Sequence, residues 1–367
     1  MNWPGWSAQK LLIPIGISFY TFKTVGYCID VYKRKYAPAS SFLTYALSVS
    51  FFPQLIAGPI EKSKVISEQL NAFPSFNWQC IIDGSKLILW GLFKKLVIAD
   101  SIAQIINPMY GHIQMANGLD FVVLCFSFMY QIYTDFSGYS DIAIGSALCF
   151  GVSLPANFNK PFFSRNYREL WNRWHTTFSR WLKEYIFDPL GGVVKNNKLR
   201  TVFNLWMVFI VVGIWHGATL NYMIYAQLAF LFMLLDIITK DFRRGLFSAM
   251  HINRNGWVQG VINYIAVMSM FSFLVVFFRP VSFKDSVYML QHVWSPHFKY
   301  LDGIKLVYIF FFIGLFEVLQ VLQKTADGHC FQRICLFHWR ALVYLFIFFS
   351  IILFSSRSEV AFQYFQF

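Results

Sequence analysis

Long apolar stretches recur along the chain, and short polar or basic segments separate them. They lie near residues 42–60, 80–106, 119–151, 202–238, 258–278, 303–322 and 340–354. Each approaches or exceeds the roughly 20 residues that a helix needs to cross a bilayer. Inside lipid the backbone must satisfy its own hydrogen bonds, and the ten-residue alternation typical of a transmembrane barrel is absent from the sequence. The pattern predicts an all-α polytopic membrane protein with about eight to ten membrane-embedded helices.

The N-terminal region predicts a bent or re-entrant entry into the membrane. The apolar stretch from Leu11 to Tyr20 is interrupted by Pro14 and Gly16, and proline bends or breaks a helix. No basic lead, continuous apolar core and cleavage site follow one another here, so no signal peptide is predicted. Since no linker or internal repeat divides the sequence, we expect a single domain over residues 1–367.

Composition strengthens the membrane assignment. Hydrophobic residues make up 57% of the chain, aromatic residues 20% and charged residues only 13%, whereas soluble domains carry about a quarter charged residues. The formal charge of +13 is divided among the segments between apolar stretches, so it indicates cytoplasmic loops and not a nucleic-acid partner. These basic segments are 33–35, 61–64, 160–200, 240–244 and 324–340.

The longest polar segment, 157–200, combines nine basic and three acidic residues with many aromatic ones. Trp171, Trp174, Phe178, Trp181 and Tyr185 recur at helical spacing and predict one amphipathic helix with an aromatic stripe. Such a helix either lies at the membrane face, with cations toward phosphates, or dips into the protein. Its arginines are also suited to gripping a phosphorylated acyl donor.

The six cysteines are scattered and predict no disulfide framework. His329, Cys330, Cys335 and His338 imitate a metal site, but their spacing matches no standard zinc pattern, so we expect an ordinary loop and no metal.

A polar patch interrupts the apolar stretch 119–151. It runs from Tyr130 to Asp141 and includes Asp135 and Ser137. Ionisable groups inside a membrane are costly, so they are candidates for function. The two carboxylates, six positions apart, would not share a face of a regular helix, although Gly138 offers a place for a break. The patch either satisfies itself across helices or lines a substrate path.

Two histidines are the strongest chemical candidates. His216 lies between Gly213 and Gly217 at the end of an apolar stretch, and His175 lies in the basic segment. A neutral imidazole accepts a proton near neutral pH, which suits a general base, and flanking glycines allow close approach. From these residues alone, a buried structural histidine remains an equal alternative. No phosphate-binding loop, dinucleotide fingerprint or serine nucleophile elbow is present, which favours direct transfer over a covalent serine mechanism.

Long motifs give the sequence a family resemblance. They are IPIGISFYTFKTVGYCIDVYK at 13–33, FFPQLIAGPI at 51–60, YQIYTDFSGYSDIAIGSALCFG at 130–151, LPANFNKPFFSRNYRELWNRWHTTFSRWLKEYIFDPLGG at 154–192, GIWHGA at 213–218, FFRPVSF at 277–283 and FQYFQF at 362–367. The chain resembles the membrane-bound O-acyltransferase superfamily, in the bacterial branch that contains alginate O-acetyltransferase and the teichoic-acid D-alanylation membrane protein.

The resemblance implies helices arranged around a central tunnel in which a cytoplasmic donor meets an acceptor from the opposite side. It implies that His216 is the general base and that His175 orients or polarises the donor carbonyl. Trp215, Asn172, Arg173 and Trp174 are weaker candidates for donor or tunnel contacts, and Asp135, Ser137 and Asp141 for substrate contacts. Relatives usually have further helices before the segment that matches residue 11, so the expected domain lacks N-terminal helices of the family.

We therefore expect a multi-pass protein of the bacterial inner membrane that transfers an acetyl group to a hydroxyl of an exported, alginate-type polysaccharide. Acetyl-CoA is the expected co-substrate, with no permanently bound cofactor, and other polysaccharide-modification proteins are expected partners. One alternative is D-alanyl transfer from a carrier protein to teichoic acid. Another is a transporter or flippase that uses Asp135 and Asp141, although the paired broken helices of transporter repeats are not seen in the sequence.

Overall fold

The structure, a computed structural model, describes residues 16–72, 75–253, 256–323 and 337–355. Within these ranges the regular structure is entirely helical. The α-helices are α1 (Ile17–Tyr32), α2 (Phe42–Ser50), α3 (Phe52–Leu55), α4 (Ser63–Asn71), α5 (Trp78–Leu92), α6 (Asp100–Gly111), α7 (Leu119–Cys149), α8 (Tyr167–Arg173), α9 (Thr176–Leu182), α10 (Lys198–Trp215), α11 (Leu220–Ile238), α12 (Lys240–Ala249), α13 (Trp257–Phe278), α14 (Phe283–His292), α15 (Gly303–Leu322) and α16 (Phe337–Phe354). The other helical segments are the π-helical η1 (Phe93–Ala99) and η4 (Lys183–Phe187) and the 3₁₀-helical η2 (Ile113–Met115) and η3 (Pro161–Phe163).

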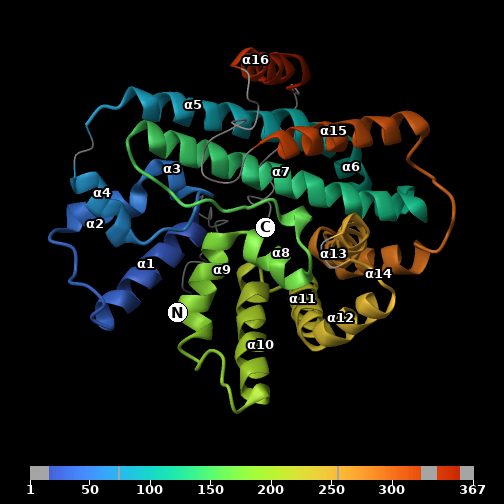
Figure 1. The fold of residues 1–367 in the computed structure, drawn as a ribbon, viewed down its shortest axis with the longest axis horizontal. Helices are drawn as coiled ribbons and strands as arrows, with labels where there is room; N and C mark the ends of the chain where they lie inside the picture. The colour runs from blue at the N-terminus through green and yellow to red at the C-terminus, as the bar shows by residue number, and fades with distance from the viewer. Residues whose placement is uncertain (1–15, 73–74, 254–255, 324–336, 356–367) are drawn as a thin grey trace, which may run out of the picture.

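Four of the described helices, α10, α11, α13 and α15, are long and apolar enough to cross a bilayer, and α16 contains a shorter apolar helix. In Figure 1, α5, α7 and α15 run across the upper half of the molecule, and α10 runs down from them. The prediction of an all-α membrane fold is confirmed. The number of eight to ten embedded helices and the single-domain organisation stay predictions.

Two predicted apolar stretches are each divided in the structure. The stretch 42–60 is not one span, because the chain turns at Phe51 and forms the short helices α2 and α3, with Pro53 in the first turn of α3. The stretch 202–238 forms α10 and α11, because Gly217 and Ala218 adopt positive φ angles of 132° and 54° and end the first helix.

The prediction of one continuous amphipathic helix through Trp171 and Tyr185 is wrong. His175 adopts a left-handed backbone conformation with φ 42° and ψ 55°, which separates α8 from α9, and η4 then follows as a π-helical turn. The segment dips into the protein, since Tyr167, Leu170 and Phe178 are buried. The second of the two expected arrangements is therefore the one observed.

Helix α7 is the central element, and glycines allow α5 to pack closely against it. The helix passes through Gly138 without the break that the sequence permitted. A Cβ atom built on Gly91 would lie 2.5 Å from the carbonyl oxygen of Gly138, and one built on Gly84 would lie 2.5 Å from that of Gly145. Glycine pairs seven residues apart on each helix thus meet in antiparallel order, which is a membrane-type packing of small residues.

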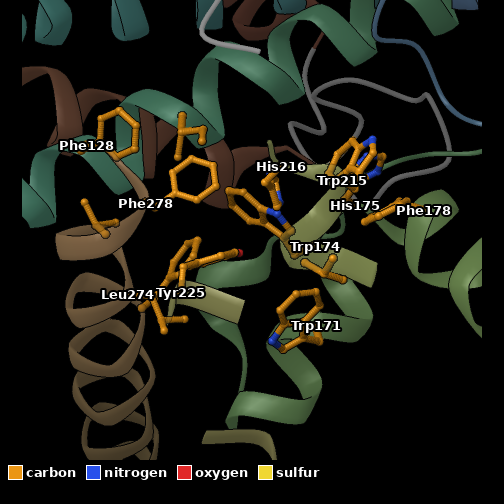
Figure 2. Close-up of a pocket in the computed structure, with 14 residues that line it drawn as sticks. Phe128, Trp171, Trp174, His175, Phe178, Trp215, His216, Tyr225, Leu274 and Phe278 are labelled. Carbon is orange, nitrogen blue, oxygen red and sulfur yellow. The ribbon is translucent and has the colours of Figure 1, made fainter. Parts of the chain in front are cut away.

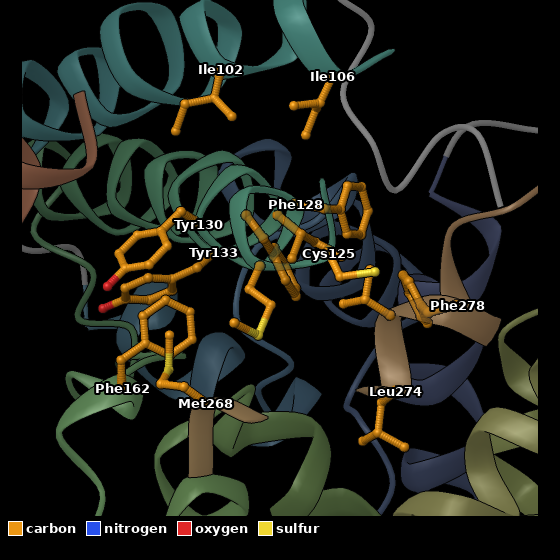
Figure 3. Packing of buried hydrophobic residues seen from close by; sticks show 14 of the residues in the cluster. Ile102, Ile106, Cys125, Phe128, Tyr130, Tyr133, Phe162, Met268, Leu274 and Phe278 are labelled. Atoms are coloured by element: carbon orange, nitrogen blue, oxygen red, sulfur yellow. The ribbon is translucent and has the colours of Figure 1, made fainter. Parts of the chain in front are cut away.

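The main hydrophobic core surrounds α7. It includes side chains of α5, η1 and α6 as well as side chains of α13 and of the segment that carries η3 (Figure 3). Tyr130 and Tyr133 each place their rings 4.9 Å from the ring of Phe162, in edge-to-face geometry. Edge-to-face aromatic pairs contribute beyond the apolar area that they bury. This packing fixes η3, and hence the start of α8, against the central helix.

Gly91→Ala is expected to lower stability by about 1–3 kcal/mol, because the added methyl group meets backbone that cannot move independently. Gly314→Ala is the matched control, since a Cβ at Gly314 in α15 meets nothing within 4 Å. Gly314→Ala should raise the stability by up to about 1 kcal/mol, because alanine has a higher helix propensity than glycine. Thermal unfolding in detergent measures both changes, and an equal response of the two variants would contradict the close contact.

Candidate functional site

A small buried cavity of about 30 Å³ lies between α7, the α8–α9 junction, α10, α11 and α13. Its wall contains both predicted histidines, and aromatic side chains make up most of the remainder, as Figure 2 shows. The aromatic residues in the wall are Phe128, Trp171, Trp174, Phe178, Trp215, Tyr225, Phe271 and Phe278. His175 and His216, 41 positions apart in the sequence, thus border one space, which sequence spacing could not establish.

His175 is a buried polar side chain in apolar surroundings. Its side chain is 2% exposed, and neither ring nitrogen has a hydrogen-bond partner among the described residues. The rings of Phe136 and Phe178 lie 4.8 and 5.1 Å from the imidazole. Burying an unpartnered polar group costs free energy, so a structural role alone does not explain the residue. Because His175 also lines the cavity, its imidazole is available to bond a molecule that enters there.

The strained backbone at His175 is held by hydrogen bonds that the next two residues along the chain make to Asn157. Thr176 donates its backbone N–H to the carbonyl oxygen of Asn157 at 2.9 Å, and the Thr177 hydroxyl donates to Oδ1 of the same asparagine at 2.6 Å. The Asn157 amide in turn donates to the Ser140 hydroxyl of α7 at 3.0 Å. A left-handed conformation at a non-glycine residue persists only where surrounding contacts over-determine it. These bonds fix the imidazole relative to α7.

His216 caps the C-terminal end of α10 and is 8% exposed. Its ring centroid lies 4.5 Å from that of Trp215, 5.1 Å from that of Phe278 and 5.6 Å from that of Tyr225. Three helices therefore position this one side chain. The residues that follow it, from Gly217 to Leu220, are exposed, so the histidine lies just inside an exposed turn.

The two glycines beside His216 have separate roles. A Cβ on Gly213 would lie 2.9 Å from the Met223 sulfur and 3.1 Å from the Ala226 Cβ, so Gly213 is required for the packing of α10 against α11. Gly217 supplies the positive φ of the turn. The close approach that the glycines were expected to allow is, at Gly213, the approach of α11.

The weaker candidates divide into two groups. Trp174 and Trp215 line the cavity, and the Trp215 ring lies 6.1 Å from the His175 ring and 4.5 Å from the His216 ring. Asn172 is exposed and faces a different, open groove, while Arg173 pairs with Glu169 at 2.6 Å. The structure thus brings the two indoles to the histidines and places Asn172 and Arg173 away from the cavity. The predicted contacts of these residues with the donor or the tunnel stay predictions.

The polar patch on α7 lies outside the histidine cavity. Asp135 pairs with Lys95 at 2.7 Å, and Asp141 pairs with Lys94 at 2.7 Å. Both lysines belong to η1, whose π-helical turn lets consecutive side chains reach two carboxylates on different faces of α7. Ser137 is buried and lines a separate polar cavity with Asp141. Of the two alternatives for this patch, the structure favours mutual satisfaction across helices.

The sequence did not predict the parts of the cavity wall that α11 and α13 provide. Tyr225 and Leu274 stand within apolar helices with no local signal to distinguish them. Phe278 lies in a motif that was noted, but the sequence did not place it beside His216. Of the possible zinc set, His329, Cys330 and Cys335 lie outside the described residues.

An ion-pair cluster joins the C-terminal end of α1 and the residues before α4 to η4, which follows His175 and α9. The Glu184 carboxylate accepts hydrogen bonds from Lys35 at 2.7 Å and from Lys62 at 2.6 Å. Lys35 also pairs with the buried Asp30 of α1 at 2.8 Å, and Tyr185 donates its hydroxyl to that carboxylate at 2.6 Å. Three of the predicted basic segments therefore meet, which supports their assignment to one face of the membrane.

The cluster predicts a pH dependence of stability. Burial raises the pKa of the Glu184 carboxyl, but the hydrogen bonds from Lys35 and Lys62 outweigh it and hold the pKa below its ordinary value of 4.5. The charged Glu184 carboxylate therefore contributes its full stabilisation when the pH is above the ordinary pKa of 4.5. This contribution is lost as the pH falls through the lower pKa of the folded state. Acidification from neutrality to below the ordinary pKa should lower the unfolding midpoint less in Glu184→Gln than in the unmodified protein. Glu68→Gln, which removes an exposed carboxylate, should behave as unmodified.

Residues 34–278 match the membrane-bound O-acyltransferase family (MBOAT), and the chain belongs to that family. It is 38% identical over 252 residues to a peptidoglycan O-acetyltransferase of Helicobacter pylori, and the match covers 59% of this chain and 46% of that protein. It is 36% identical over 215 residues to the probable alginate O-acetylase AlgI of Pseudomonas aeruginosa, covering 59% and 41% of the two chains.

A third relative is named for the transfer of a D-alanyl group instead of an acetyl group. The chain is 31% identical over 231 residues to a teichoic acid D-alanyltransferase of Streptococcus thermophilus, covering 59% of this chain and 55% of that protein. The matched region thus spans about half the length of these relatives. The resemblance on which the prediction of an O-acyltransferase rests is confirmed, and both histidines lie within the matched residues 34–278.

Proposed function

We propose that the protein is a multi-pass O-acyltransferase of the bacterial inner membrane. It transfers an acetyl group from a cytoplasmic donor of the acetyl-CoA class to a hydroxyl of an exported polysaccharide, with an alginate-type glycan as the leading acceptor. The observation that carries this proposal is the placement of His175 and His216 on one buried cavity. Family membership supports acyl transfer, and the relatives named as O-acetylating enzymes support the acetyl group.

His216 acts as the general base in the proposed reaction. Its imidazole takes the proton of the acceptor hydroxyl as the oxygen attacks the thioester carbonyl, and a tetrahedral oxyanion forms. Collapse of the oxyanion breaks the carbon–sulfur bond, and the departing thiolate takes the proton back from the imidazolium. The products are an O-acetyl ester and a free thiol. A positioned base typically contributes about 10²–10⁴-fold to such a step.

His175 orients or polarises the donor carbonyl. A protonated ring nitrogen can donate a hydrogen bond to the carbonyl oxygen, and burial strengthens that bond because little water competes. Neither nitrogen of His175 is engaged by another described residue, so no part of the chain that the structure describes uses this donor capacity. The surrounding hydrogen bonds to Asn157 fix the ring before the substrate arrives, which lowers the reorganisation that transfer requires.

The cavity must enlarge for both substrates to meet. Its volume of about 30 Å³ accommodates roughly two water molecules. Trp215 stands between the histidines and is half-buried, and Trp174 is also half-buried. Movement of these indoles would admit a thioester from one side and a hydroxyl from the other. The small resting cavity would protect the donor from hydrolysis by water.

D-alanyl transfer from a carrier protein to teichoic acid is the second candidate, because a relative of that name matches the same share of the chain. The chemistry at the histidines would be the same, and only donor and acceptor would differ. The transporter alternative is disfavoured, since Asp135 and Asp141 are both ion-paired with lysines of η1.

The direct experiment supplies purified protein in phospholipid with radiolabelled acetyl-CoA and alginate oligosaccharide. We expect label in an alkali-sensitive ester, and we expect His216→Ala to lower the transfer rate by about 10²-fold or more. His175→Asn should also lower it, because asparagine accepts the left-handed backbone but lacks the imidazole. A parallel reaction with a D-alanyl carrier protein and teichoic acid tests the second candidate.

His297→Ala is the matched control, because His297 is exposed and is not among the residues that line the histidine cavity. It should retain full transfer. Size-exclusion profiles establish that all variants remain folded. Unchanged transfer by folded His216→Ala would remove this histidine as the base, whereas substrate accumulation in vesicles without an acylated product would support transport instead.

A further inference from the structure

An open groove of about 400 Å³ lies between the α8 segment, α12 and the first half of α13. It is distinct from the histidine cavity, although α8 contributes to both: Trp171 lines the cavity and Asn172 lines the groove. The lining of the groove is strongly cationic, with Arg165, Arg168, Lys240, Arg243 and Arg244.

Only part of this positive charge is neutralised within the protein. The groove contains two carboxylates: Glu169 is engaged by Arg173 at 2.6 Å, and Asp236 is engaged by Arg243 at 2.6 Å. The side chains of Arg165, Arg168 and Lys240 make no hydrogen bond or ion pair with another described residue, and all three are exposed. Arg165 bonds the Glu169 carboxylate only through its backbone N–H. The groove therefore presents at least three cations to a ligand, and arginine forks are suited to binding phosphate oxygens in pairs.

The position of α12 places the groove at the boundary of the bilayer. The helix connects α11 and α13, both of which are long and apolar enough to span a membrane, and it lies beside α11 in Figure 1. None of the residues of α12 is buried. Phe242 and Leu246 of this helix are 72% and 47% exposed, and Met250, which follows it, is 59% exposed. A short helix with cations and exposed apolar side chains is typical of one that lies in the membrane interface.

We propose that this groove binds the headgroup of an anionic phospholipid. The phosphodiester lies against Arg165, Arg168 and Lys240, and the acyl chains pass along the apolar residues of α12 into the bilayer. Basic pockets next to membrane-spanning helices bind anionic headgroups in this way. The exposed apolar residues favour a lipid over a soluble phosphate, which would leave them without a partner. The inference does not depend on the proposed acyl transfer.

The test uses the full chain purified in a neutral detergent and titrated with short-chain phosphatidylglycerol or phosphatidylcholine. Native mass spectrometry measures the retained lipid, and thermal unfolding gives an independent affinity. Phosphatidylglycerol is expected to bind at least about tenfold more tightly than phosphatidylcholine. The variant Arg165→Gln/Arg168→Gln/Lys240→Gln should lose this preference, and its exposed substitutions leave the core intact.

The control variant Lys33→Gln/Lys195→Gln/Lys198→Gln removes the same charge from exposed sites outside the groove. It should retain the preference for phosphatidylglycerol. Equal loss in both triple variants would show a non-specific charge effect and overturn the site. Equal protection by glycerol 3-phosphate and by phosphatidylglycerol would overturn the lipid assignment, because it would show that the acyl chains contribute nothing.

Discussion

The burial of His175 on a strained backbone is the constraint on which the site depends. A left-handed histidine that has no partner for either ring nitrogen among the described residues is costly, and the neighbouring contacts hold it there. Asn157 satisfies the start of α9 and is itself bonded to Ser140 of α7. The same break that strains the backbone turns the basic, aromatic segment inward, so that one face of α8 reaches the cavity with Trp171 and Trp174.

The central helix connects this constraint to the rest of the fold. Close glycine contacts join α7 to α5, and lysines of η1 neutralise both of its central carboxylates. These ion pairs tie α7 to η1, because removing Lys95 would leave the buried Asp135 carboxylate without this partner. The polar patch that the sequence marked as a functional candidate is thereby explained as structure, and the chemical role falls to the histidines that this support positions.

Much of the fold could be predicted from the sequence, because apolar length and backbone satisfaction in lipid leave few choices. The sequence pointed to His175, His216, Trp174 and Trp215 through their motifs and not through spacing, and the structure places all four at one cavity. The break between α8 and α9 at His175 could not be predicted from the sequence, because regular aromatic spacing does not reveal a residue with a left-handed backbone conformation. The sequence also could not give Tyr225 and Phe278 as walls, because contacts between distant helices leave no local pattern.

The proposed reaction requires that the two imidazoles face a space where the acyl group reacts. The most direct measurement is a cryo-EM structure of the protein in lipid with a non-hydrolysable acetyl-CoA analogue. We expect the acyl carbonyl to lie within hydrogen-bonding distance of His175, with His216 on the side open to the acceptor. An analogue bound elsewhere, with both rings still enclosed by the same aromatic side chains, would contradict the account.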